Sequence, residues 1–261
     1  MIVGYILAII VGISLGLTGA GGSILTLPIL VYVMKIDAVT ATGYSLFIVG
    51  ATSLVGTTRS FIHHQVNLRM GMLFGLPSIL TAIAVRTFLI PILPDVFFRV
   101  RSFALTKNIF LLLLFAVVMI GASVNMIKPQ KLHTEKWPSL FSLIVTGILV
   151  GTLTGLVGAG GGFLIIPALV LFLKLPMKKA VGTSLFIITL NTLCSFIGGL
   201  VHTQVNWGVL LIFTAVSIVG IFIGFRFSNK IPGARLKPIF GWFILLMGVF
   251  IILKELLFTN N

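Results

Sequence analysis

Few side chains in this chain could carry out acid–base, nucleophilic or metal chemistry. Its 261 residues include four carboxylates, four histidines and one cysteine. The carboxylates fall in loops or near the ends of apolar segments, and no cysteine or carboxylate lies at metal-ligand spacing from His63 or His202. The apolar segments therefore offer no paired carboxylates, no Ser–His–acid set and no metal cluster. We expect no enzyme activity, no metal site and no cofactor.

Two glycine-rich stretches carry groups that could instead bind an anion. The sequence LGLTGAGGSILTLP begins at Leu15, and TGLVGAGGGFLIIP begins at Thr154. Because a glycine inside a helix costs about 1 kcal/mol relative to alanine, we expect one helix to end and a short one to begin at each stretch. The free N–H groups and positive dipole end of a helix start bind anions without a charged side chain. The predicted anion-binding residues are Gly19, Ala20, Gly21, Gly22 and Ser23 in the first stretch, and Gly158, Ala159, Gly160, Gly161 and Gly162 in the second. The alternative is that these small residues only let membrane helices pack closely.

A second repeated motif adds hydroxyl groups. Residues 43–45 read Gly-Tyr-Ser and residues 182–184 read Gly-Thr-Ser, each at the expected start of another helix. Ser45, Thr183 and Ser184 could contact the anion or simply cap the helix. Asn191 lies inside an apolar segment, where an amide needs a partner, and is a further candidate contact.

A third repeated motif, His-x-Gln-Val-Asn, falls where a helix gives way to a loop. Histidine in such a position can be a turn residue, a proton carrier or a metal ligand, and the absence of other ligands argues against metal. The motif is either a structural turn or a gate or proton switch, with candidates His63, Gln65, His202 and Gln204.

Composition sets the class of protein. Hydrophobic residues make up 58% of the chain, charged ones 8%, and the mean hydropathy is +1.23, so the chain cannot cover itself with a water-facing surface. Its long apolar runs predict an all-α polytopic protein embedded in a lipid bilayer. The net charge of +14 does not indicate nucleic-acid binding, because the cations stand singly between apolar runs, as topology signals do.

The chain is one unit used twice. At an offset of 139, residues 16–67 align without a gap with residues 155–206, with 22 identities over 52 positions. This predicts an N-terminal membrane repeat over 1–127, a polar linker over 128–139 and a C-terminal membrane repeat over 140–261. Each repeat holds about four or five helical segments, expected at 2–18, 22–35, 41–58, 69–93 and 103–127, and at 140–157, 161–174, 180–200, 207–228 and 236–258.

The short second segment of each repeat is either a thin span or half of a re-entrant hairpin. In both cases each repeat crosses the membrane an odd number of times, which inverts the second repeat relative to the first. The loops rich in Lys and Arg exchange places between the repeats, as inversion requires under the positive-inside rule. Placing the basic loops in the cytoplasm puts both termini outside it, and brings the two glycine-rich stretches towards one pocket near the midplane.

The combined motifs resemble the TauE/SafE family of membrane permeases, often called sulfite exporters. The resemblance rests on the doubled GxGG stretch followed by proline, the G-x-S-L-F segment and the His loop, and it covers essentially the whole chain. It implies a transporter of the bacterial inner membrane for small sulfur oxyanions or organosulfonates, such as sulfite or thiosulfate. The family's glycine motif maps onto Gly19, Gly21, Gly22, Gly158, Gly160 and Gly161. Ser23 stands where the second repeat has Gly162, so the two half-sites would not be chemically equal.

The direction of transport follows from electrostatics. An inside-negative potential favours the exit of an anion by about 2.3 kcal/mol per charge per 100 mV, and no carboxylate lies within a span to bind a coupling cation. We therefore expect export. One alternative is uptake of the same anions. The other is a membrane subunit that assembles with a partner and transports nothing. The sequence also leaves open that the protein forms a homodimer.

Overall fold

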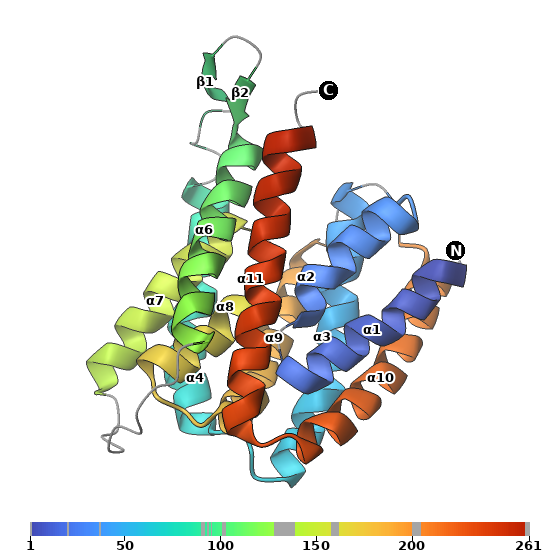
Figure 1. The fold of residues 1–261 in the computed structure, drawn as a ribbon, viewed down its shortest axis with the longest axis vertical. Helices are drawn as coiled ribbons and strands as arrows, with labels where there is room; N and C mark the ends of the chain where they lie inside the picture. Colours follow the sequence, from blue (N-terminus) through green and yellow to red (C-terminus); the bar gives the residue numbers. More distant parts are fainter. Residues whose placement is uncertain are drawn as a thin grey trace.

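The computed structural model describes residues 2–19, 21–36, 38–89, 92, 94, 96–100, 103–127, 139–157, 162–199 and 205–258. The predicted polar linker lies almost wholly outside them. The described part consists of helices apart from one short two-stranded hairpin (Figure 1), which confirms the prediction of a helical membrane fold. Short helices stand at both glycine-rich stretches, as expected.

In its described residues the first repeat contains five α-helices, two π-helical extensions and a hairpin of two strands. In chain order these are α1 (Ile2–Thr18), α2 (Gly21–Pro28) with its extension η1 (Ile29–Val33), α3 (Ala38–Ile62), α4 (Leu68–Ala84) with its extension η2 (Val85–Leu89), the strands β1 (Val96–Val100) and β2 (Phe103–Thr106), and α6 (Lys107–Ile127). The strands pair antiparallel. The expected helical segment at 103–127 therefore begins four residues late, because its first residues pair with β1.

The second repeat has the same order of helices without a hairpin in the described residues. It comprises α7 (Leu140–Val157), α8 (Gly162–Pro167) with its extension η3 (Ala168–Phe172), α9 (Met177–Gly199), α10 (Trp207–Lys230) and α11 (Gly233–Phe258). Within the described residues, five helices are long and apolar enough to cross a membrane.

Local details repeat at the same offset as the sequence. Lys35 and Lys174 end the π-helical extensions with positive φ angles of 55° and 53°. Asn67 and Asn206 each cap the next helix, because their side chains accept hydrogen bonds from the backbone N–H three residues on, at 3.1 Å and 3.2 Å. The sequence repeat is thus a structural repeat.

Helices of different repeats pack against each other in matched pairs. Helix α1 runs parallel to α10, where a Cβ on Gly12 would collide with the carbonyl oxygen of Ser217. Helix α7 runs parallel to α4, where a Cβ on Gly151 would collide with the carbonyl oxygen of Ser78. Each residue of the first contact lies 139 positions from its counterpart in the second. Glycine is required at both contacts because the backbones touch.

The central helices show how the repeats are oriented. Gly50 of α3 packs against Leu193 of α9, whereas Gly56 packs against Leu185, so residue numbers rise along one helix as they fall along the other. Helices α6 and α11 also run in opposite directions (Figure 1). These two pairs of counterpart helices are therefore antiparallel, as the inversion predicted from the sequence would require.

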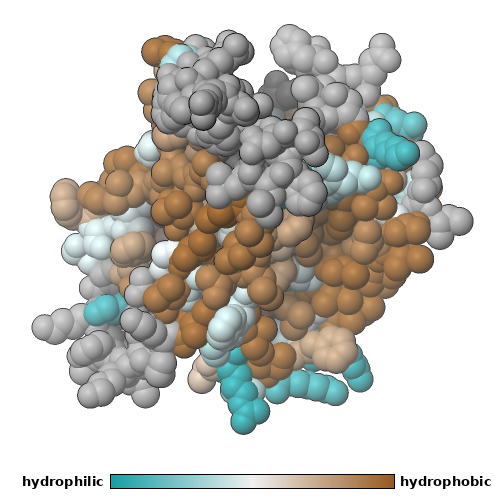
Figure 2. Space-filling view, turned by 45° about the horizontal axis from the view of Figure 1, so that its top comes forward, coloured by the Kyte–Doolittle hydropathy of each residue, from teal (hydrophilic) through white to brown (hydrophobic). Residues whose placement is uncertain are grey.

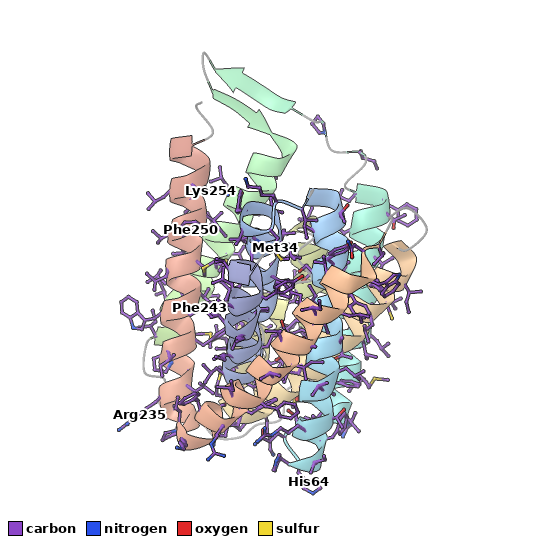
Figure 3. The ribbon with its side chains drawn as sticks, turned by 90° about the vertical axis from the view of Figure 1, so that its right-hand side faces the viewer. Met34, His64, Arg235, Phe243, Phe250 and Lys254 are labelled. Carbon is purple, nitrogen blue, oxygen red and sulfur yellow. The ribbon has the colours of Figure 1, made fainter. Side chains whose placement is uncertain are left out.

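The surface suits a bilayer. Large hydrophobic side chains such as Ile6, Leu80 and Leu246 are more than half exposed. Figure 2 shows hydrophobic residues over the middle of one face and hydrophilic ones at its lower edge and at its upper right. His64 and Arg235 lie at one end of the bundle and Lys254 at the other (Figure 3). By its apolar helices and composition, the chain is an integral membrane protein.

We call the end with His64 and Arg235 the basic end. There the turn between α10 and α11 meets the start of α9, since a Cβ on Gly233 would lie 3.8 Å from Cβ of Met177. The basic residues in or next to the turns of this end are Arg59, Arg69, Lys174, Lys178, Lys179, Arg226, Lys230, Arg235 and Lys237.

Candidate functional site

Helices α1 and α2 form a hairpin that turns at Gly19. Cβ atoms on Gly4 and Gly22 would meet the side chains of Met34 and Leu15, so α2 and η1 return along α1. Gly19 has a φ of 73°, a left-handed conformation that side chains other than hydrogen disfavour, and its N–H donates to the carbonyl of Leu15 at 2.7 Å. The glycine ends α1, and α2 starts at Gly21, two residues later. The predicted helix break is confirmed here.

The turn lies inside the bundle. A Cβ on Gly19 would stand 2.9 Å from the Val181 side chain and 2.9 Å from Ser184 Oγ. These residues follow the start of α9, Met177, by four and seven positions, or about 6–10 Å at 1.5 Å per residue. The chain therefore reverses between the basic end and the middle of the bundle, which favours the hairpin over a complete thin span.

Two repeated motifs from opposite repeats meet at this turn. Ser184 Oγ lies 3.3 Å from the carbonyl oxygen of Gly19 and 2.8 Å from that of Val181, and it donates its one proton between them. Both Thr183 and Ser184 are fully buried. They occupy the second turn of α9, so they do not cap its start as one interpretation of the sequence allowed.

The third motif joins the same place. Thr183 Oγ1 accepts a hydrogen bond of 3.0 Å from the backbone N–H of Asn67, and a Cβ on Gly182 would lie 2.6 Å from the carbonyl oxygen of Gln65. We call Gly19, Gln65, Asn67, Thr183 and Ser184 the first cluster. It combines two motifs of the first repeat with one of the second.

A second cluster mirrors the first with the repeats exchanged. Tyr44 Oη accepts a hydrogen bond of 2.5 Å from the backbone N–H of Asn206, and these residues are the counterparts of Thr183 and Asn67 at the offset of 139. Ser45, half buried, follows Tyr44 on α3. The rest of this half-site lies outside the described residues: Gly158, Ala159, Gly160, Gly161, His202 and Gln204.

The other predicted residues fall near the clusters or at the centre. Ala20 is outside the described residues, while Ser23 and Gly162 lie in the first turns of α2 and α8. His63 is exposed at the basic end beside the half-buried Gln65. Asn191 lies near the middle of α9 and is 8% exposed.

Sequence reasoning did not single out Tyr44 and Asn67, whose hydrogen bonds join the motifs. The signal was present, since both repeats carry a hydroxyl residue after the glycine at 43 or 182 and an asparagine at 67 or 206. What could not be seen is that each hydroxyl bonds to the other repeat.

The first cluster is polar without being acidic. Its described groups are backbone amides and carbonyls, hydroxyls and the Gln65 amide. The guanidinium carbon of Arg59 lies 4.9 Å from the centroid of the Phe225 ring on α10. Gly16 of α1 contacts the backbone of α10 at the same residue. In the described part of the chain, no three histidine, cysteine or acidic residues come together as metal ligands. The arrangement offers hydrogen-bond donors to a solute without adding negative charge.

Comparison with known proteins identifies the family of the chain. A model of the family described as sulfite exporter TauE/SafE matches residues 5–251. A probable membrane transporter protein of Xylella fastidiosa (strain 9a5c) is 27% identical over 255 residues, covering 94% of this chain and 92% of that protein. The probable membrane transporter protein YunE of Bacillus subtilis (strain 168) is 26% identical over 266 residues, covering 93% and 94%. The probable membrane transporter protein MJ0441 of Methanocaldococcus jannaschii is 36% identical over 126 residues, covering 46% and 47%. No solved structure matches the chain.

Proposed function

Because the chain belongs to the sulfite exporter TauE/SafE family, we propose that it is a permease that exports a small sulfur-containing anion, of the sulfite, thiosulfate or organosulfonate class. The anion binds within the bilayer at the helix starts that follow the two glycine-rich turns. The observation that carries this proposal is the first cluster, where a helix breaks inside the bundle and polar motifs of both repeats gather around the break.

The break supplies the binding chemistry. The first N–H groups of α2 have no partners within that helix, and hydrocarbon cannot solvate them. Together with the positive end of the helix dipole they favour a negative solute. Gly21 begins α2, so no side chain at this position shields the backbone.

The two clusters favour alternating access. Each cluster contains residues of both repeats, so rocking one repeat against the other changes both at once. The first cluster lies towards the basic end, whereas the second contains Tyr44, near the end of α3 that is away from the basic end. An anion released from one cluster would thus leave on the other side of the membrane.

We propose that the basic end faces the cytoplasm of a bacterial-type inner membrane and that both termini lie outside it. The support is the collection of Lys and Arg at that end, since the positive-inside rule follows short loops of this kind. Lys178→Cys in a Cys194→Ser background should react with a membrane-impermeant maleimide only in inverted vesicles. Labelling from right-side-out vesicles would reverse the orientation.

Export follows from this orientation without a coupling ion. The membrane potential expels anions by about 2.3 kcal/mol per charge per 100 mV, twice that for a dianion. Flux of sulfite in proteoliposomes should rise when the potential drives anions out of the compartment facing the basic end. Accumulation against that potential would instead favour uptake.

The decisive experiment is flux by the purified protein in liposomes loaded with sulfite or thiosulfate. Gly21→Leu and Gly160→Leu should abolish it, because a bulky side chain covers the proposed N–H groups. The control Gly121→Leu, at an exposed site on α6 where no described atom lies within 4 Å of the added Cβ, should leave flux unchanged. No anion flux from folded wild-type protein would favour the non-transporting partner subunit.

A further inference from the structure

Helix α3, which packs against α9, carries three buried hydroxyls without partners between its middle and its basic end. Thr52 and Ser53 are 0% exposed and Ser60 is 2% exposed. Their hydroxyl oxygens have no hydrogen-bond partner among the described residues. The hydroxyl of Thr154 also has no partner, but it lies on α7, apart from the three hydroxyls of α3. A buried hydroxyl without a partner is destabilising, so each of these needs an explanation.

The three hydroxyls do not turn back onto their own helix, as other threonines here do. Thr26, Thr192 and Thr214 each donate to the carbonyl four residues earlier, at 2.6 Å, 2.7 Å and 2.7 Å. That bond is open to any Ser or Thr in a helix. Thr52, Ser53 and Ser60 therefore present free O–H donors to their surroundings.

Helix geometry places all three on the side of α3 that packs against α9 and α10. Gly50 contacts Thr192, with its added Cβ 2.8 Å from Thr192 Oγ1, and Thr57 Oγ1 lies 3.2 Å from Thr189 Oγ1. Ser53 lies three residues after Gly50 and four before Thr57, so it is on the same face of α3. Thr52 and Ser60 stand four residues either side of Gly56, whose added Cβ would lie 2.7 Å from Ile221 of α10 and 3.1 Å from Leu185 of α9. The hydroxyls form a row of about 12 Å along the helix.

The row connects the middle of the bundle with the first cluster. Thr52 and Ser53 lie near the middle of α3, whereas Ser60 lies two residues before its end at the basic end. Because Gly56 packs against Leu185, Ser60 reaches the level of Ser184, the residue that contacts the Gly19 turn. The row of hydroxyls thus extends from the level of the Gly19 turn to the middle of α3.

The second repeat does not continue the row. The counterparts of Thr57 and Ser60 are Phe196 and Gly199, and Phe196 packs against Phe47 with ring centroids 5.0 Å apart. Phe196 therefore stands in α9 where α3 has the hydroxyl of Thr57. In the described residues, the row of unpartnered hydroxyls runs from the middle of α3 towards the basic end.

We propose that Thr52, Ser53 and Ser60 are an additional binding station for the transported oxyanion, which passes along them between the first cluster and the centre. This rests on the proposed function. An oxyanion is the ligand the chemistry favours, because free O–H groups donate to it and it brings several acceptor oxygens. A cation is disfavoured, since it needs a shell of oxygen ligands, while the carbonyls of continuous helices are already bonded and neither α3 nor α9 contains a carboxylate.

The test removes single hydroxyls at constant shape. Thr52→Val and Ser53→Ala should each raise the sulfite concentration for half-maximal flux in proteoliposomes by about tenfold or more, the factor that corresponds to one hydrogen bond to a charged partner. The melting temperature should stay unchanged or rise, because no intramolecular bond is lost. The control Thr214→Val removes a buried hydroxyl that bonds to its own helix and should leave the half-maximal concentration unchanged.

Three outcomes would contradict the proposal that these hydroxyls bind the transported anion. Wild-type flux kinetics in both variants would show that the hydroxyls meet no transported anion. A lowered melting temperature in both variants would show that the hydroxyls have structural partners. A flux that depends on Na⁺ over choline in the wild type, and loses that dependence in the variants, would assign the row to a cation. Wild-type protein without anion flux would overturn the proposed function as well.

Discussion

Replacing Gly19 by alanine should destabilise the hairpin turn through both its backbone conformation and its packing. A left-handed residue with a Cβ costs about 1–2 kcal/mol, and the φ of Gly19 is 73°. The new Cβ would also stand 2.9 Å from Val181 Cγ1, Val181 O and Ser184 Oγ, and overpacking of that kind costs about 1–3 kcal/mol. We expect Gly19→Ala to lower the free energy of unfolding by about 2–5 kcal/mol.

Thermal unfolding in detergent measures the effect. A chain of this size loses roughly 2–4 °C per kcal/mol, so the melting temperature should fall by at least about 4 °C. Gly19→Asn separates the two causes, because asparagine tolerates the left-handed conformation better yet carries the same Cβ. If strain dominates, asparagine is the milder change; if packing dominates, both changes are equally severe. An alanine variant that melts with the wild type would refute the reasoning about the turn.

Two further predictions test the relation between the repeats. Gly12→Ala and Gly151→Ala should each destabilise the protein by about 1–3 kcal/mol, because both added Cβ atoms meet a carbonyl oxygen of the facing helix; a large effect at only one site in thermal melts would contradict the equivalence of these contacts. Tyr44→Phe and Thr183→Val each leave a partly buried backbone N–H without its acceptor, so each should cost about 1–3 kcal/mol, whereas the exposed Thr58→Val should change the melting temperature little.

The fold was predictable wherever a local pattern had one physical solution. The glycines at 19, 21 and 22 weaken a helix, and the chain does break there. Asn67 and Asn206 cap helices because an asparagine before an apolar run satisfies free N–H groups. The two-stranded hairpin at 96–106 escaped prediction, because an apolar run next to a predicted helix has no mark of its own that separates strand from helix.

The sequence motifs identified individual site residues, but they did not show which of these residues lie together. The repeat identified Gly19, Thr183 and Ser184 as candidates, yet gave no sign that the glycine of one repeat would contact the serine of the other. At the offset of 139, Thr52 and Ser53 correspond to Asn191 and Thr192 of α9, but the sequence does not show that the hydroxyls of Thr52 and Ser53 are buried and unpartnered. Such facts depend on which faces of two distant helices meet, and helix spacing leaves that open.

Taken alone, the order of residues determined that this is a helical membrane protein built from two copies of one unit, because hydropathy, glycine content and an ungapped internal match are properties of the chain itself. Only the packed structure decided that the copies interlock, with α1 against α10 and α4 against α7, so that each polar cluster takes residues from both. The reason is that contacts between helices are set by the shapes of whole faces brought together from far apart in the chain, and no stretch of sequence carries that information locally.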